Sequence, residues 1–269
     1  MSRPALVKLG GSLLTDKSKE RAFRRTAARR LLAEVVKSGV PTVVLHGAGS
    51  FGHPAAARHE IGKKAPGPHP AGAVAASDVM AGVALLSAQV VDLAHIVGLR
   101  PLHVPLHFHC HMEGDDLIGV PVERIRRLLE EGFTPVLSGT LVRDDEVAWR
   151  VVSADQLMEV LAPELAPRLA VMATDVEGVF DRHPDDEGAA LLPEVDVAAL
   201  DDLEQAAGVG NGAGGAGGGA DVTGRMLGKV RRALTVAESC PTVILDGSVR
   251  GRLLDALKGK SVPGTRVVA

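Results

Sequence analysis

The sequence predicts an α/β protein with an open, mostly parallel β-sheet and helices on both faces, arranged as an αβα sandwich. Short apolar runs alternate with helical patterns almost from end to end of the 269-residue chain, which is typical of such sheets. The runs are continuous stretches of Val, Leu and Ala rather than alternating apolar and polar residues. Strands that are buried on both faces have that continuity.

Seven apolar runs are the predicted strands. They cover residues 5–9, 41–45, 100–104, 134–137, 169–174, 242–245 and 265–268. A further segment, residues 141–152, carries charged residues at 143–146 between apolar pairs. This pattern predicts a β-hairpin.

Amphipathic helices are predicted between the strands. Residues 26–37 place their leucines and valines on one stripe and stop at Gly39, and residues 120–131 stop in the same way at Gly132. Glycine ends many helices because it adopts the left-handed conformation without a steric penalty. The most apolar long segment, residues 79–99, is interrupted by Ser, Gln, Asp and His. These residues would be costly in lipid, so we expect a buried helix and no membrane span.

Two segments interrupt the alternation of strands and helices. Residues 60–72 are rich in Gly, Pro and Lys and predict a mobile loop. Residues 208–219 consist mostly of Gly and Ala and predict a flexible surface loop. The chain has no internal repeat and no clear linker. We therefore expect one domain over residues 1–269, with two lobes of about residues 1–150 and 151–269 that share one sheet.

Composition excludes several classes of protein. The formal net charge of -3 and the pI near 6.4 leave no basic surface for nucleic acid. Cys110 and Cys240 lie far apart without a paired spacing, which argues against a disulfide framework or a zinc site. The first residues show no secretion signal. We expect a cytoplasmic protein.

A glycine turn follows the first predicted strand. Lys8 lies within the strand, Gly10, Gly11 and Ser12 follow it, and Lys17 comes soon after. Such glycines let backbone N–H groups face an anion, and the lysines supply positive charge. The spacing is not that of a Walker A loop, and a plain tight turn is the alternative interpretation. A lysine inside an apolar strand favours the anion site, because it is rarely tolerated without an anionic partner.

The second predicted strand leads into another glycine-rich turn. It contains Gly47, Ala48, Gly49, Gly52 and His53. The turn falls at the carboxyl edge of the sheet, where open α/β sheets bind ligands. Two such turns suit two phosphate-bearing groups. A lone histidine is often a plain surface residue, but glycines that bare the backbone beside it favour a ligand contact.

Five motifs follow one another along nearly the whole chain. They are Lys8-Leu9-Gly10-Gly11-Ser12 with Lys17, His46-Gly47-Ala48-Gly49-Ser50-Phe51-Gly52-His53-Pro54, Ser153-Ala154-Asp155, Ala173-Thr174-Asp175-Val176-Glu177-Gly178-Val179, and Asp221-Val222-Thr223-Gly224-Arg225-Met226 with Lys229. In this order they resemble the isopentenyl phosphate kinases of the amino acid kinase superfamily. Fosfomycin kinases share much of the same layout.

The resemblance implies the amino acid kinase fold, a homodimer, and direct in-line transfer of a phosphoryl group from ATP to isopentenyl phosphate. Residues 1–150 would bind the acceptor and residues 151–269 would bind ATP. Lys8 and Lys229 would flank the transferring group, Lys17 would reach the donor's phosphates, and Asp155 would hold the two lysines. The chemistry agrees, because a phosphate oxygen needs no base and catalysis reduces to positioning and offsetting charge.

The resemblance also assigns residues to each substrate. The acceptor side would consist of Gly47, Ala48, Gly49, Gly52, His53, Ser138, Gly139 and Ser153. The nucleotide side would consist of Gly10, Gly11, Ser12, Thr174, Asp175, Gly178, Thr223, Gly224 and Lys229. Within the first set, His53 would donate a hydrogen bond to the acceptor's phosphate. Mg²⁺ would arrive with ATP, and no carboxylate cluster demands metal ligands of its own.

Three positions depart from the family pattern. Ala48 replaces a usual glycine, which only a backbone position with negative φ tolerates. Ser138-Gly139-Thr140 replaces a usual glycine-aspartate pair, so the local acceptor or metal contacts differ. Arg225 stands where a second glycine is common and adds a cation near the phosphates.

A cluster of histidines has two interpretations. His103, His107, His109 and His111 lie close to Cys110, and imidazoles that alternate along an extended segment can bind zinc or nickel. No carboxylate joins them at ligand spacing, and they lie far in sequence from the glycine turns. A variable loop over the acceptor pocket is the favoured interpretation.

Rival functions remain open from the sequence. Residues 79–97 offer Val79, Met80, Val83, Leu85, Leu86, Val90, Val91 and Ile96 as a wall suited to an isoprenoid tail. A fosfomycin kinase would need a more polar wall. An amino acid or carbamate kinase is disfavoured because no arginine near the pocket is placed to bind a carboxylate. A nucleotide-binding regulatory or storage protein without turnover is the third alternative.

Overall fold

The computed structural model describes residues 2–62, 70–206 and 222–269, with side chains from residue 72 and from residue 226 onward in the last two ranges. The predicted loop at 208–219 lies outside the described residues. Only the ends of the predicted loop at 60–72 lie within them, and helix α4 already begins at Pro70.

The main sheet has eight strands and is parallel throughout except at one pair. Its order is β12 (Glu194–Val195), β14 (Thr265–Val267), β13 (Thr242–Asp246), β9 (Leu169–Thr174), β1 (Ala5–Leu9), β2 (Thr42–His46), β6 (Thr134–Ser138) and β3 (Pro101–His103). Only β13 and β14 pair antiparallel. All seven predicted strands are therefore confirmed, to within about two residues at each end.

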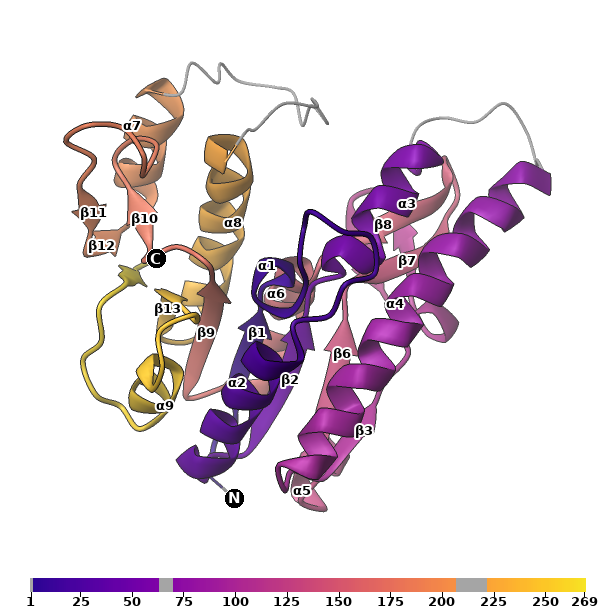
Figure 1. The fold of residues 1–269 in the computed structure, drawn as a ribbon, viewed down its shortest axis with the longest axis horizontal. Coiled ribbons are helices and arrows are strands. Elements are labelled where there is room, and N and C mark those ends of the chain that lie inside the picture. The colour runs from indigo at the N-terminus through magenta and orange to yellow at the C-terminus, as the bar shows by residue number, and fades with distance from the viewer. Residues whose placement is uncertain (1, 63–69, 207–221) are drawn as a thin grey trace.

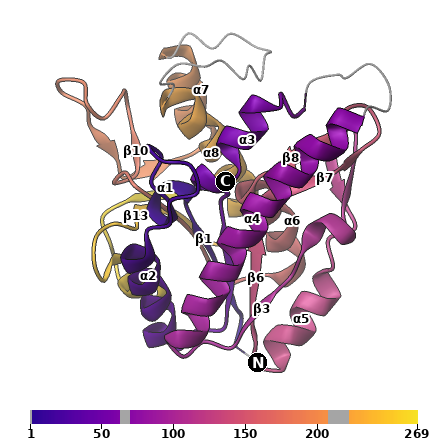
Figure 2. The ribbon, with the colours of Figure 1, turned by 45° about the vertical axis from the view of Figure 1, so that its right-hand side comes forward.

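Helices cover both faces of this sheet (Figures 1 and 2). On one face lie α1 (Gly11–Leu14), α2 (Arg25–Ser38), α4 (Pro70–Ile96) and α9 (Arg252–Leu257), and on the other lie α5 (Val122–Glu130), α6 (Ala154–Leu165) and α8 (Val222–Ala237). Helix α7 (Val197–Ala206) packs against α8. Neighbouring strand residues point to opposite faces, so Val7 joins the core of the first layer and Leu6 that of the second. The predicted αβα sandwich is confirmed.

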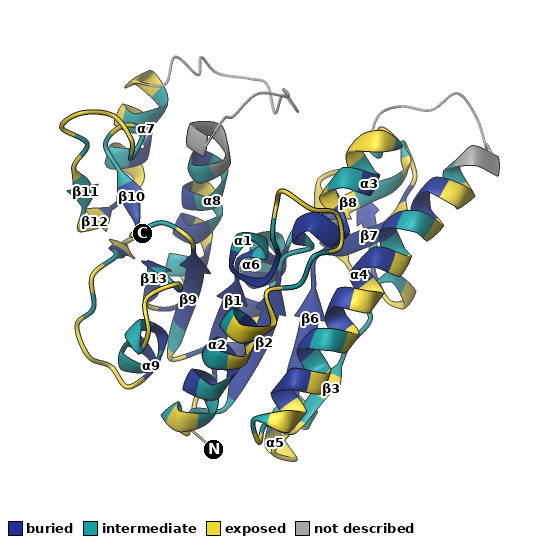
Figure 3. Ribbon diagram, in the orientation of Figure 1, coloured by how far each residue is buried: buried dark blue, intermediate teal, exposed yellow. Residues whose placement is uncertain are grey.

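The pattern of buried residues follows the layers of the sandwich. The strands are buried over most of their length, whereas α2 and α4 expose their outer faces (Figure 3). By length and composition, α4 is the one helix among the described residues that could cross a membrane. Its Leu86, Val90 and Leu93 are fully buried against the sheet. It therefore serves as a core helix in this structure.

A smaller sheet and several short elements lie beside the carboxyl edge of the main sheet. Strands β5 (Asp116–Ile118), β4 (His111–Glu113), β7 (Thr140–Asp144) and β8 (Ala148–Val152) form a four-stranded sheet. Its β7–β8 pair confirms the predicted hairpin. The turn after β2 forms η1 (Gly49–Phe51) and α3 (His53–Arg58), and η2 (Leu106–Phe108) precedes β4. Strands β10 (Val179–Phe180) and β11 (Leu191–Leu192) form a separate pair.

Candidate active site

A lysine from the central strand β1 and a lysine from helix α8 meet at one carboxylate. The Nζ of Lys8, on β1, lies 2.9 Å from Oδ1 of Asp155, and the Nζ of Lys229, on α8, lies 3.1 Å from Oδ2. The three side chains are 8%, 12% and 16% exposed for Lys8, Lys229 and Asp155. Three residues separated by up to 221 positions in sequence thus form one largely buried ionic group.

The start of α6 fixes the carboxylate in this group. Ser153 is the N-cap of α6, and its Oγ accepts a hydrogen bond from the backbone N–H of Gln156 at 3.0 Å. Asp155 therefore stands in the first turn of the helix, where the helix dipole favours a negative charge.

The charges in this group control one another. Burial by itself raises the pKa of Asp155, but the charges of Lys8 and Lys229 outweigh it and hold that pKa well below the usual 3.8. Burial lowers the pKa of Lys229 below the usual 10.5, the charge of Lys8 lowers it further, and Asp155 opposes both. Asp155 therefore holds two cations side by side that would otherwise repel each other.

The two glycine turns lie back to back beside Lys8. A Cβ added to Gly11 would come within 2.7 Å of the Cα of Gly49, and Gly49 itself has φ +49°. Neither position accepts another residue without moving backbone. Ala48 has φ -70°, so the alanine that replaces a family glycine stands where any residue is tolerated. The turns can approach each other, and a ligand, because side chains are absent there.

A cleft of about 530 Å³ opens over the lysines and both turns. Its walls include most of the residues that the sequence assigned to the site. These are Lys8, Gly10, Gly11, Ser12, Lys17, Gly47, Ala48, Gly52, His53, Gly139, Ser153, Asp155, Thr174, Asp175 and Lys229. The structure thus brings residues of all five motifs to one cavity.

Several assigned residues do not line this cleft. Gly49 packs behind the first turn, and Ser138 is buried at the end of β6. Gly178 lines a second cavity of about 230 Å³ that shares Val176 and Met226 with the cleft. The side chains of residues 222–225, which include Thr223 and Gly224 of the nucleotide assignment and Arg225, lie outside the described part of the structure.

A second, more open ion pair stands at the cleft's other side. The Nζ of Lys17 lies 3.5 Å from Oδ2 of Asp175, with side chains 62% and 43% exposed. Burial raises the pKa of Asp175, but a hydrogen bond with Ser12 and the charge of Lys17 outweigh it and lower that pKa. Because the pair is loose and exposed, Lys17 can leave Asp175 for a phosphate at little cost.

The apolar wall of the cleft differs from the predicted one. Of the α4 side chains that the structure describes, only Val79 and Val83 line it, and Leu141 and Val151 from the β7–β8 hairpin complete it. Most of the other predicted residues serve different purposes. Leu86 and Val90 pack against the sheet and Val91 borders the same core, Leu85 and Ile96 are 45% and 50% exposed, and Met80 packs against the small cluster that contains Val79 and Val83. The prediction was wrong there because a helix 27 residues long passes the cleft with only about one turn.

The histidine cluster contributes nothing to the cleft. None of its members lines the cavity, so the predicted loop over the acceptor pocket is wrong. The segment instead forms η2 and strand β4, where His111 pairs with Glu113 at 2.9 Å. Within residues 2–62, 70–206 and 222–269, no group of three His, Cys, Asp or Glu side chains is arranged to hold a metal ion.

Two residues that support the second glycine turn received no role in the sequence analysis. His46 is fully buried, its Nε2 lies 3.1 Å from the Ser87 hydroxyl, and burial lowers its pKa to about 4. Gly82 of α4 faces the same turn, and a Cβ there would lie 2.0 Å from the carbonyl oxygen of Phe51. His46 heads the recognised motif, but a single glycine in an apolar helix gives no signal of close packing.

Comparison with known proteins agrees with this arrangement. The amino acid kinase family matches residues 3–246. An isopentenyl phosphate kinase from Methanothermobacter thermautotrophicus is 32% identical over 97% of this chain and 98% of its own length, and one from Thermoplasma acidophilum is 33% identical over 71% and 75%. A solved isopentenyl phosphate kinase structure superposes with a TM-score of 0.83 at 28% identity, covering 98% of this chain and 99% of the other. This chain belongs to the amino acid kinase family, and within it to the isopentenyl phosphate kinases.

Proposed function

We propose that this protein is an ATP-dependent kinase that phosphorylates isopentenyl phosphate to isopentenyl diphosphate. The observation that carries the proposal is one cleft that joins a buried lysine pair to an apolar wall, between Lys8 and Lys229 on one side and Val79 and Val83 on the other. Phosphate groups suit the first part and a short hydrocarbon tail suits the second. Nothing in the site or the relatives favours a phosphonate acceptor or a protein without turnover.

The lysine pair carries the transfer in this proposal. An oxygen of the acceptor's phosphate attacks the γ-phosphorus of ATP, the bond from that phosphorus to the β–γ bridging oxygen breaks, and ADP leaves. Lys8 and Lys229 flank the moving group and offset its charge, while Asp155 keeps both ammonium groups in place. Lys17, released from Asp175, holds the donor's phosphates. No group needs to act as a base.

The remaining assigned residues hold the two substrates in this proposal. On the acceptor side, His53 stands at the first position of α3 and lines the cleft together with Gly47 and Gly52. On the nucleotide side, Gly11 offers its backbone N–H group, whereas the N–H of Gly10 donates to the carbonyl oxygen of Ala173 at 2.9 Å, and Thr174 ends β9 at the same edge. Gly139 and Ser153 border the acceptor's phosphate. The second cavity, which contains Gly178, extends the nucleotide side.

We propose that Mg²⁺ binds to this site together with ATP. The residues of the cleft fit a metal that would be held by phosphate oxygens and water, because both carboxylates of the described lining are paired with lysines, Asp155 with Lys8 and Lys229, and Asp175 with Lys17. When bound, Mg²⁺ offsets charge on the donor's phosphates.

The organisation of the molecule completes the proposal. Residues 1–150 supply α3, α4 and the β7 strand beside the acceptor, and residues 151–269 supply β9 and α8 beside ATP. We also propose that the protein is a homodimer, which light scattering tests. A cytoplasmic location fits the two cysteines, which are both free and buried.

Release of ADP by the purified protein tests the function. The acceptors are isopentenyl phosphate, dimethylallyl phosphate, fosfomycin and methyl phosphate, each with Mg²⁺ and ATP. We expect the highest kcat/KM with isopentenyl phosphate. A faster reaction with fosfomycin, or no reaction with any acceptor, would contradict the proposal.

A further inference from the structure

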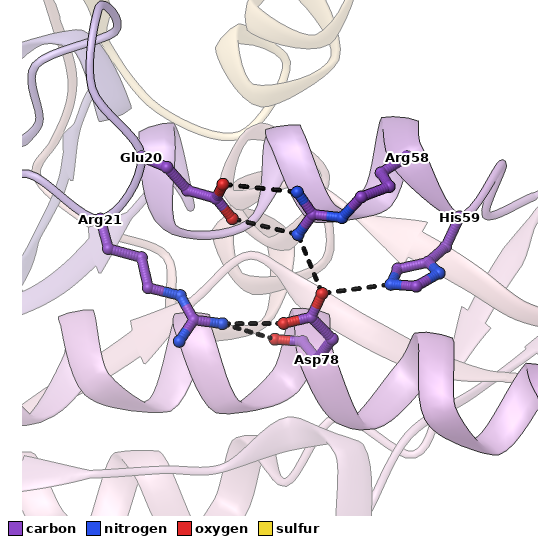
Figure 4. Close-up of polar contacts among 5 residues, drawn as sticks. All are labelled: Glu20, Arg21, Arg58, His59 and Asp78. Atoms are coloured by element: carbon purple, nitrogen blue, oxygen red, sulfur yellow. Dashed lines mark hydrogen bonds and ion pairs between the residues drawn. The ribbon is translucent and has the colours of Figure 1, made fainter.

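A network of five charged or titratable side chains lies outside the cleft. Arg58 donates hydrogen bonds to both carboxylate oxygens of Glu20, at 3.1 and 3.4 Å, and to Oδ2 of Asp78 at 3.0 Å. Arg21 donates to Oδ1 of Asp78 at 2.8 Å, and Nε2 of His59 lies 3.1 Å from Oδ2. Figure 4 shows Asp78 at the centre, with its partners around it. The carboxylate of Asp78 thus binds three side chains that come from two other segments of the chain.

Each partner belongs to a segment that carries a cleft residue. Arg21 follows Lys17 by four positions in the same loop. Arg58 ends the helix α3 that His53 begins. Asp78 directly precedes Val79, which lines the cleft from α4. The network therefore joins three segments: the loop that carries Lys17, the helix that His53 begins, and the part of α4 that forms the apolar wall.

The loop is held in an unfavourable backbone conformation where it meets the network. Arg21 has φ 55°, a left-handed conformation that non-glycine residues rarely adopt and that persists only where the surroundings impose it. Its N–H donates to the carbonyl oxygen of Ser50 at 3.0 Å, and its side chain is fixed by Asp78. The loop is thereby attached to the second glycine turn and to α4 at once.

Asp78 lies close to the point where α4 packs on the second glycine turn. Gly82 follows Asp78 by one helical turn on the same face of α4, and it packs directly on the carbonyl of Phe51. Hydrogen bonds from Arg58 and His59 hold the pKa of Asp78 below its usual value. Asp78 therefore stays charged at working pH, one helical turn from the point where α4 contacts the turn that leads to His53.

We propose that Asp78 is a positioning residue that ties the loop of Lys17 and the helix of His53 to one point on α4. The tie sets the separation between the donor and acceptor contacts. The naming of those contacts rests on the proposed function, whereas the tie itself rests on the geometry alone. Half-exposed ion pairs contribute little to global stability, so the network acts mainly on the placement of these two segments.

Kinetics of Asp78→Asn test the proposal, with Asp92→Asn as the matched control. Asp92 is another carboxylate on α4, paired with Arg25 at 3.8 Å, and it lies away from the cleft. In Asp78→Asn, kcat/KM for the acceptor and for ATP should both fall, by about tenfold to a hundredfold. Asp92→Asn should stay within about twofold of wild type. Asp78→Glu should recover part of the loss, because it restores a carboxylate.

Hydrogen exchange gives a readout that does not depend on the reaction. Peptides that cover residues 16–24 and 53–61 should both exchange faster in Asp78→Asn, while the strands keep their protection. Unchanged exchange in either segment would overturn the proposal, as would equal kinetic losses in the Asp92 variant. If wild type turns over no acceptor, the proposed function fails, but the exchange result still decides the role of Asp78.

Discussion

The lysine pair and the Asp78 network both join distant segments through one carboxylate, but solvent reaches them very differently. Lys8, Lys229 and Asp155 are 8–16% exposed, whereas the network's side chains are 27–50% exposed. The buried group is built before any substrate arrives, and each member depends on the others for charge compensation. The exposed group exchanges its contacts with water at little cost. One side of the cleft is therefore rigid and the other is adjustable.

The difference matches what each side must do. The transferring phosphoryl group needs charges that do not reorganise during the reaction. The acceptor and the donor's terminal phosphates must enter and leave, so the segments that hold them must be able to shift. Each prediction below tests one side against the other.

The largest effect is expected from the rigid side. Lys8→Ala or Lys229→Ala should lower kcat by roughly a hundredfold, or ~3 kcal/mol, with a smaller change in KM for ATP. Each charge contributes most when the phosphoryl group lies between its two partners. Steady-state ADP release measures both constants. Wild-type turnover in both variants would remove these lysines from the mechanism.

The next largest effect, on the free energy of unfolding, is expected where α4 packs on the second glycine turn. Gly82→Ala places a methyl group 2.0 Å from the Phe51 carbonyl oxygen, and such overpacking costs about 1–3 kcal/mol of unfolding free energy. Gly72→Ala is the matched control on the same helix, because no described residue has an atom within 4 Å of its Cβ position. That change should stabilise the protein by about 0.5–1 kcal/mol. Denaturant unfolding measures both, and the same sign for both would contradict the packing.

Sequence patterns predicted the layers and the rigid side well. Strand positions follow from local apolar runs, and Lys8, Asp155 and Lys229 stand in motifs with a regular order. The adjustable side was predicted less well. Glu20, Arg58 and Asp78 lie 20 to 58 positions apart, and charged residues at such distances give no pattern before the chain folds. The number of α4 residues that line the cleft also depends on the angle at which the helix crosses it. The spacing of apolar residues in the sequence does not encode that angle.

Acid should weaken the fold through a residue beneath the acceptor side. The pKa of His46 is lowered to about 4 by burial, against 6.5 for an ordinary histidine. The unfolded chain therefore binds the extra proton first, and stability that is complete above pH 6.5 is lost as the pH falls toward 4. At pH 5 the loss should be about 2 kcal/mol. Urea unfolding at several pH values measures it, and His46→Asn should flatten the profile. A wild-type profile that is already flat would show that the fold does not lower the pKa of His46.

The smallest effect is expected at the apolar wall. Val83→Ala removes the equivalent of two CH₂ groups beside the acceptor's tail, and at about 0.8 kcal/mol for each the loss in kcat/KM for isopentenyl phosphate should be about tenfold. Methyl phosphate has no tail to reach Val83, so its kcat/KM should hardly change. Leu85→Ala is the matched control on α4, because Leu85 is 45% exposed and lies outside the cleft. The ratio of the kcat/KM values for the two acceptors reports on the wall alone, because general damage to the fold would lower both values together. An unchanged ratio in Val83→Ala, or an equal change in Leu85→Ala, would mean that the acceptor's tail lies elsewhere.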